Sequence, residues 1–387
     1  MTRPLFFCLL VALVLRLGFI FVGFPRLQER WHLREDGDSY GAIAQTIREG
    51  HYDDITRGPV YPFFVAVAGS PLAMKVVQAL LDTLTCALIF WLARLVIHAP
   101  RFRSDVPVWA AWLWALYPLA IWRIAFINKE IVLTFLLVAY VCVQLTAWCD
   151  DKTWRWLAAG ALLGVVNLCK PTFLLLPLVV LVMRPRRGLL VLAAMLVVVV
   201  PWTARNWRVT GGEFLPVATE QGGSTTFVGN YQPTAGLWEG DGKTRWQGEI
   251  ERIKQQNAGA SVVALDRQFY HETWKQMTVN PLVAVELIVR KCGRFWFLGA
   301  ARREQSVSIA IQAVWLALAM IGLWRCRPWG AAQTLMVVLV VYVMLVHALS
   351  YADLRFSLPV MPFVCAFAAA GICRFGIRRQ TTVGADD

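Results

Sequence analysis

Long apolar segments joined by short connections dominate this sequence. A helix that crosses a bilayer needs about 20 mostly apolar residues. The chain has 387 residues, of which 58% are apolar and only 16% charged, so it is too apolar for a soluble or disordered protein. We therefore expect an all-α polytopic membrane protein with about ten transmembrane helices. The expected spans are 4–24, 72–97, 106–123, 130–148, 154–169, 171–183, 188–204, 307–324, 331–350 and 356–374.

Basic residues in the short connections predict the orientation of these spans. The first apolar segment has no small-residue cleavage site and contains Arg16, so we interpret it as an uncleaved span rather than a signal peptide. With the N-terminus inside, every short inner connection carries Lys or Arg, as the positive-inside rule requires. Much of the net charge of +13 is then a topology signal and not a sign of nucleic-acid binding.

Two long polar segments, 25–71 and 205–306, are expected on the outer side. They divide the chain into an N-terminal membrane module at 1–204, an outer region at 205–306 and C-terminal helices with a short inner tail at 307–387. Amphipathic helices are predicted after Tyr40 and over 281–299, while the apolar stretch 58–70 is too short to cross and predicts a re-entrant or interfacial piece.

Charged residues gather at the outer ends of the expected spans. Asp36 and Asp38 precede the first outer helix, where one Asp could serve only as an N-cap. Each basic residue on this side could individually be reaching for lipid headgroups. Together, however, they favour a phosphate site that faces a carboxylate. The basic residues are Arg57, Lys129, Lys170, Arg205 and Arg355.

Other patterns carry less functional information. Glu220–Ser224 and the nearby Asn230 lie in glycine-containing stretches that could line a substrate, although glycine is also an ordinary loop residue. Arg16 and Asp82 lie at similar depth within spans and predict a structural ion pair. The five His are scattered and the nine Cys lack zinc-binding spacing, so the sequence predicts no metal centre from these residues.

The order of these motifs resembles the GT-C glycosyltransferases. Within that superfamily it is most similar to the bacterial branch related to protein O-mannosyltransferases and lipid A aminoarabinose transferase. The resemblance rests on an acid four residues before a Tyr (Asp36 and Tyr40), and on the stretch from Arg57 through Tyr61 to Pro62. It departs from the family at Gly37, where a second acid is common. The further matches are Glu130, Lys170-Pro171-Thr172, Pro201-Trp202, Arg205-Asn206, Gly229-Asn230 and Arg355-Phe356.

The resemblance implies a glycosyltransferase that moves a hexosyl or pentosyl group from a polyprenyl-phosphate donor to an envelope acceptor with inversion. The acceptor would be a glycolipid, a glycan or a protein, and the site would face outward from the plasma (inner) membrane. Asp36 would be the base, with Asp38 beside it; a divalent metal at this pair would fit, and none is required. Arg57, Lys170, Arg205 and Arg355 would hold the donor phosphate. Tyr40, Tyr61, Glu130 and Asn230 would complete the substrate site.

Two other classes remain open from the sequence. A lipid-linked sugar transporter or flippase would favour charged residues at mid-membrane, whereas here they lie at the outer end. A polysaccharide polymerase or ligase would also work on the outer face. Such an enzyme would depend on basic and His residues in a large outer loop.

Overall fold

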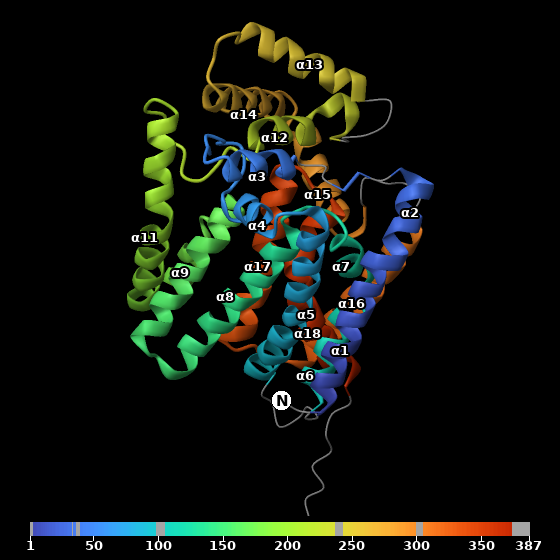
Figure 1. Cartoon of the computed structure of the whole chain (residues 1–387). Coiled ribbons are helices and arrows are strands. Elements are labelled where there is room, and N and C mark those ends of the chain that lie inside the picture. Colours follow the sequence, from blue (N-terminus) through green and yellow to red (C-terminus); the bar gives the residue numbers. More distant parts are fainter. Residues whose placement is uncertain are drawn as a thin grey trace, which may run out of the picture.

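The computed structural model describes residues 3–32, 34–35, 39–97, 105–236, 243–298 and 305–373. This part of the chain is helical and contains no strand, which confirms the predicted all-α class. Long helices form a bundle, and further helices cover one of its ends (Figure 1). We call three of these covering helices the cap: α12 (Gly222–Asn230), α13 (Lys243–Gln256) and α14 (Val262–Val279).

Seven helical segments of the described chain are long and apolar enough to cross a membrane, each matching an expected span. Many of their large apolar side chains are exposed, as lipid-facing residues would be; Val14, Val197 and Met320 are examples. The segments are Arg3–Trp31 (α1, a π-helical turn and α2), α5 (Pro71–Val96), α8 (Glu130–Asp150), α11 (Pro185–Val209), α16 (Gln305–Arg325), α17 (Ala331–Leu349), and Leu354–Ile372, which comprises the 3-10 helix η5 (Leu354–Val360) and α18 (Met361–Ile372).

The other three expected spans have shorter helices, so the total of ten stays a prediction. Segment 106–123 is divided into α6 (Val106–Ala115) and α7 (Pro118–Arg123). Tyr117 is extended between them, because the residue before a proline avoids the helical region. Segment 154–169 is the single helix α9 (Thr153–Cys169), and 171–183 is the 3-10 helix η2 (Pro171–Phe173) followed by α10 (Leu176–Met183).

The first span is longer than expected. It continues through a π-helical turn, Phe19–Gly23, into α2 (Phe24–Trp31), so the first outer segment begins after Trp31 and not at residue 25. Pro25 does not end the helix because it lies in the first turn of α2, where a proline removes no helical hydrogen bond.

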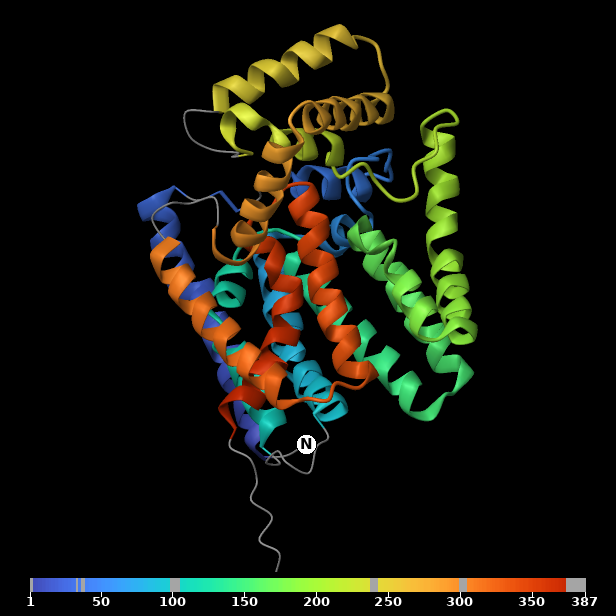
Figure 2. The ribbon, with the colours of Figure 1, turned by 180° about the vertical axis from the view of Figure 1, so that it is seen from behind.

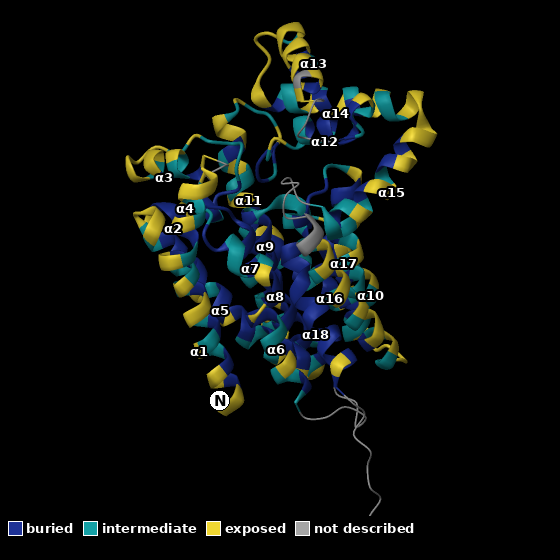
Figure 3. Ribbon diagram, turned by 90° about the vertical axis from the view of Figure 1, so that its right-hand side faces the viewer, coloured by how far each residue is buried: buried dark blue, intermediate teal, exposed yellow. Residues whose placement is uncertain are grey.

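Small residues allow the centre of the bundle to pack closely. Every residue of α18 from Met361 to Gly371 is buried (Figure 3). A Cβ atom on Gly322 of α16 would lie 1.8 Å from the Phe367 carbonyl oxygen, and one on Gly371 would lie 2.1 Å from the Leu318 carbonyl oxygen. Glycine at both positions therefore lets α16 and α18 approach backbone to backbone, as is common between membrane helices.

The expected ion pair lies inside the bundle and is confirmed. Arg16 Nε donates to Asp82 Oδ2 at 2.5 Å, and both side chains are fully buried. The guanidinium also donates to the carbonyls of Ala12 and Ala115, while Trp114 Nε1 donates to Asp82 Oδ1 at 3.1 Å. This network joins α1, α5 and α6.

The two predicted outer segments meet at the same end of the bundle. Helices α3 (Tyr40–Arg48) and α4 (Val60–Ala68) lie beneath the cap, and the N-terminal end of α1 lies at the opposite end (Figures 1 and 2). Helix α15 (Pro281–Phe297) leads from the cap towards the bundle, and it is the amphipathic helix expected at 281–299. The expected short helix at 58–70 corresponds to α4.

We predict that the cap faces the outside of the cell. A cysteine introduced by Arg245→Cys in α13 should react with a membrane-impermeant maleimide on intact cells. Cys149, an exposed thiol at the other end of α8, should react only after permeabilisation and serves as the internal control. Gln380→Cys in the C-terminal tail should behave like Cys149. The reverse pattern would show that the orientation is wrong.

Candidate active site

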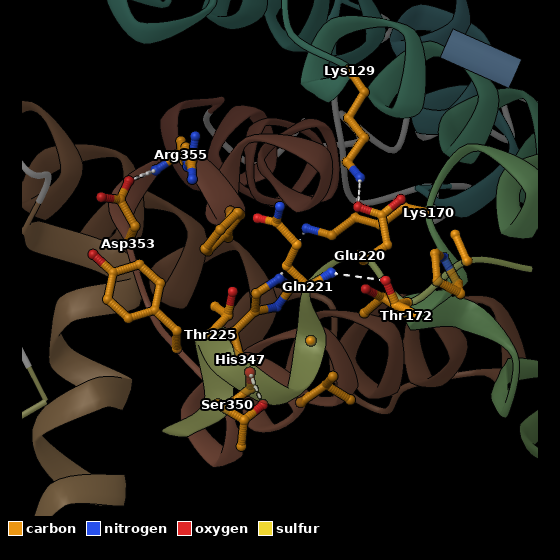
Figure 4. Close-up of a pocket in the computed structure, with 18 of the residues that line it drawn as sticks. Lys129, Lys170, Thr172, Glu220, Gln221, Thr225, His347, Ser350, Asp353 and Arg355 are labelled. Carbon is orange, nitrogen blue, oxygen red and sulfur yellow. Dashed lines mark hydrogen bonds and ion pairs between the residues drawn. The ribbon is translucent and has the colours of Figure 1, made fainter. Parts of the chain in front are cut away.

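A cavity of about 810 Å³ lies between the cap and the end of the bundle (Figure 4). Among the described residues, five basic and three acidic side chains line it, so it carries a surplus of positive charge. Five of the residues predicted from the sequence are brought together here: Arg57, Lys129, Glu130, Lys170 and Arg355. The other charged side chains of the lining are Arg123, Glu220 and Asp353.

Arg57 reaches the cavity because the chain next to it packs tightly. A Cβ atom on Gly58 would lie 2.4 Å from the Leu168 carbonyl oxygen, so only glycine allows this loop to contact the end of α9. The Arg57 guanidinium lies over the Tyr40 ring, 5.8 Å from its centroid. Tyr40 in turn packs edge-on against Tyr61, and both rings are buried. These two tyrosines therefore support Arg57 from below.

Glu220 is bound by two of the cavity's cations. Its carboxylate accepts a hydrogen bond from Lys129 Nζ, lies 3.7 Å from Arg57 Nη1, and accepts from the Gly58 amide at 2.9 Å. Burial opposes ionisation of Glu220, but the neighbouring Lys129 and Arg57 outweigh it and hold its pKa below the usual value. Glu220 is therefore an anion that links the cavity's basic residues.

Lys170 and His347 form a hydrogen-bonded pair in the cavity. His347 Nδ1 lies 2.8 Å from the Val343 carbonyl oxygen, which can only accept, so Nδ1 carries the proton. Nε2 is then an acceptor for Lys170 Nζ at 3.1 Å. Burial, reinforced by the charge of Lys129, lowers the pKa of Lys170 to about 8. Lys170 is therefore a cation near neutral pH that loses its charge more readily than an ordinary lysine.

Glu130 contributes a carboxylate oxygen that has no hydrogen-bond partner among the described residues. It is the first residue of α8 and is 2% exposed. Within the described chain, nothing donates a hydrogen bond to Glu130 Oε2. A buried carboxylate oxygen left unpaired is costly and marks a position where a bound group would donate.

Two predicted site residues, Arg205 and Asn230, lie outside the cavity lining. The Arg205 guanidinium donates to the carbonyls of Tyr52 and Asp54, and it lies over the Tyr52 ring. Asn230 is buried and donates to the Leu349 carbonyl. Arg205 thus fastens the first outer loop to α11, and Asn230 fastens α12 to the end of α17.

Tyr61, a further predicted residue, is also fully buried and donates from its hydroxyl to Gln78 Oε1 at 2.8 Å. It therefore contributes to the site through Tyr40 and does not line the cavity itself.

Asp36 and Asp38 lie outside the described residues, so their predicted roles stay predictions. The chain on either side of them is described. The Glu35 carbonyl accepts from the Ile127 amide at 2.8 Å, close in sequence to Lys129, and Tyr40 lies beneath Arg57. In the described residues no group of three or more His, Cys, Asp or Glu could hold a metal ion. The metal considered at Asp36 and Asp38 is therefore untested.

Several lining residues were not predicted as site residues from the sequence. His347 is one of the five scattered histidines, and it lies within an apolar span, so no local pattern marks it. Glu220 and Gln221 were considered only as part of a glycine-rich stretch. The structure shows a feature of both residues that the sequence does not reveal. Each has a positive φ of 52°, which is uncommon for a residue other than glycine. Such strained residues cluster at functional sites.

Known proteins support the predicted superfamily. The model of glycosyltransferase family 87, a GT-C-type family, matches residues 60–233, slightly less than half of the chain. That stretch carries Lys129, Glu130, Lys170 and Glu220 of the cavity. The fold is that of the GT-C membrane glycosyltransferases. The narrower bacterial branch expected from the sequence stays a prediction.

Two of the solved structures whose fold is similar to that of this chain are of an archaeal oligosaccharyltransferase. One is AglB from Archaeoglobus fulgidus in complex with an inhibitory peptide and a dolichol-phosphate, with 14% identity and a TM-score of 0.53. The apo form from the same organism gives 15% identity and a TM-score of 0.53. Each comparison covers 95% of this chain and 49% of the other, so this chain spans about half the length of those proteins. No curated protein sequence matches this one.

Proposed function

We propose that this protein transfers a sugar from a polyprenyl-phosphate donor to an envelope acceptor, and that the cavity beneath the cap is its active site. The observation that carries the proposal is the gathering of five basic side chains around a cavity at the end of a membrane bundle. A membrane-embedded donor would bring its phosphate to that depth. The binding of dolichol-phosphate by the AglB structure supports a lipid-phosphate donor for this GT-C fold in general terms.

The chemistry follows from the charges. As the acceptor hydroxyl attacks the anomeric carbon, a new carbon–oxygen bond forms and the bond from that carbon to the phosphate oxygen breaks. The polyprenyl phosphate leaves with the electron pair. Arg57, Lys170 and Arg355 would stabilise that charge by charge-assisted hydrogen bonds, usually a large contribution to catalysis. A single displacement of this kind inverts the anomeric centre.

Asp36 is the proposed base that accepts the acceptor's proton. In the sequence it lies between Glu35 and Tyr40, whose described contacts are with Ile127 and Arg57 near the cavity. Asp38 follows it by two residues in the sequence, and a divalent ion at the pair remains compatible with the proposal. The acceptor would be a glycolipid, a glycan or a protein, approaching on the outer face of the plasma membrane.

The charge of Arg57 provides a direct test. Arg57→Ala removes a cation from the phosphate site, so binding of undecaprenyl phosphate to the purified protein should weaken by about 10- to 100-fold. Arg94→Ala is the matched control, because Arg94 is an exposed arginine at the opposite end of α5. Equal affinities in the two variants would contradict the assignment of the phosphate site. Vectorial transport of a lipid-linked sugar without any transfer product would favour the flippase instead.

The pH dependence of binding should report on Lys170. Because its pKa is lowered to about 8, Lys170 is charged below that pH and becomes neutral as the pH rises through it. Affinity for undecaprenyl phosphate should therefore fall between about pH 8 and 10 in the wild type. Lys170→Arg keeps its charge throughout and should retain its affinity over the same range. Isothermal titration at several pH values measures both profiles; parallel profiles would show that Lys170 does not contact the phosphate.

A further inference from the structure

The two walls of the cavity differ in chemistry. The bundle side supplies the cations: Arg57 comes from the first outer loop, Arg123 from the end of α7, Lys129 and Lys170 from the residues just before α8 and η2, and Arg355 from η5. The cap and the segment leading into it supply Glu220 and several uncharged polar side chains. Figure 4 labels two of the uncharged ones, Gln221 and Thr225. These uncharged polar lining residues are Thr219, Gln221, Thr225, Thr226 and Tyr270.

Gln221 and Thr225 are the members of this set whose side chains are available to a ligand. Gln221 is the N-cap of α12 and Thr225 lies in its first turn, and both line the cavity. Within the described part of the chain, neither the Gln221 amide group nor the Thr225 hydroxyl has a hydrogen-bond partner. The Thr226 hydroxyl, by contrast, is bonded to the Ser350 hydroxyl at 2.8 Å and joins the cap to the bundle.

The local backbone directs these side chains. Glu220 and Gln221 both adopt the left-handed conformation, which places the Glu220 carboxylate on Lys129 and leaves the next side chain at the cavity. Glycine follows because a Cβ atom on Gly222 would lie 2.4 Å from the Tyr270 hydroxyl, and one on Gly223 would lie 2.1 Å from the Asp266 carbonyl oxygen. The start of α12 is thus packed against α14. Gln221, Thr225 and Thr226 line the cavity, and Thr226 is bonded to Ser350.

We propose that Gln221 and Thr225 bind the hydroxyl groups of a sugar ring and thereby determine which sugar the enzyme accepts. This inference rests on the proposed function. A sugar attached to a phosphate held at Lys170 is joined to it through a single oxygen, so its ring must occupy the adjoining part of the cavity. Amide and hydroxyl groups both donate and accept, as sugar hydroxyls do. The ring belongs either to the donor or to the acceptor, which share this chemistry.

The experiment compares a carrier with and without its sugar. The probes are undecaprenyl phosphate alone and undecaprenyl phosphate carrying mannose, glucose or arabinose, whichever the wild type binds most tightly. Thr225→Val and Gln221→Leu should each weaken binding of the sugar-carrying probe by about three- to tenfold, and leave binding of the bare carrier unchanged. Thr278→Val is the matched control, since Thr278 is an exposed residue of the cap helix α14 that does not line the cavity, and it should change neither affinity.

A second arm identifies the source of the ring. If octyl mannoside, added with the bare carrier, loses affinity in the two variants while the sugar-carrying donor does not, then the ring is that of the acceptor. Unchanged binding of every sugar-containing probe overturns the inference. Lys170→Ala tests the proposed function separately, because it should weaken the bare carrier. If Lys170→Ala weakens binding of the bare carrier while Gln221→Leu and Thr225→Val change no affinity, the phosphate site is supported and the sugar site is excluded.

Discussion

Replacing Asp36 by Asn should reduce turnover by at least about 100-fold, because general base catalysis typically contributes about 10²–10⁴-fold. Asn has nearly the size of Asp and caps helices about equally well, so the local structure should survive. The substitution removes only the basic oxygen. Turnover with a confirmed donor and acceptor measures the effect, while undecaprenyl phosphate binding and the melting temperature should stay close to those of the wild type.

Asp38→Asn is the control for this prediction, and a smaller loss is expected. Full activity in Asp36→Asn with none in Asp38→Asn would move the base by two residues and preserve the enzyme class. Normal turnover in both variants would exclude the first outer loop from the chemistry. Loss of turnover on chelation with EDTA, restored by one divalent ion, would establish the metal considered at this pair.

The second large effect is expected far from the cavity. Asp82→Leu removes the partner of a fully buried guanidinium, and an uncompensated buried charge typically costs about 3–5 kcal/mol. The melting temperature of the purified protein in nanodiscs should therefore fall sharply. The fraction that remains folded should turn over donor normally, because the pair does not line the cavity.

The double variant Arg16→Met with Asp82→Leu tests the cause of that loss. It removes both charges, so most of the lost stability should return, although Trp114 then lacks its acceptor. Replacement of a buried ion pair by apolar residues is often neutral or stabilising. A double variant as unstable as Asp82→Leu alone would show that shape, and not unpaired charge, accounts for the damage.

Much of the architecture was predictable because lipid imposes simple rules on sequence. Apolar length predicted the seven long spans, and the cost of charge in a membrane drew attention to Arg57, Lys170 and Arg355. The break at Tyr117 was missed, since a proline within an apolar run is tolerated in many membrane helices and does not by itself reveal a break. The first span was predicted too short, because the polar residues of α2 gave no sign that the helix continues to Trp31.

The site was predictable only in part because it is assembled by packing. Lys170 and His347 are 177 residues apart, and their hydrogen bond depends on how α17 meets the end of α9. Sequence alone also cannot separate a basic residue that faces a cavity from one that fastens a loop. Arg205 and Arg57 were both predicted to hold the donor phosphate. The Arg205 guanidinium, however, donates hydrogen bonds to the carbonyls of Tyr52 and Asp54.

The buried contact between α12 and the end of α17 limits how the outer region can be exchanged between relatives. Lys291 Nζ donates to the Asn230 side chain at 2.7 Å and to the Ser350 carbonyl at 3.0 Å. A Cβ atom on Gly229 would lie 2.2 Å from that same carbonyl oxygen. Residues 205–306 therefore depend on contacts with the end of α17. A chimera that imports them without the matching turn at 349–351 would lose the contacts that Lys291 and Gly229 make there.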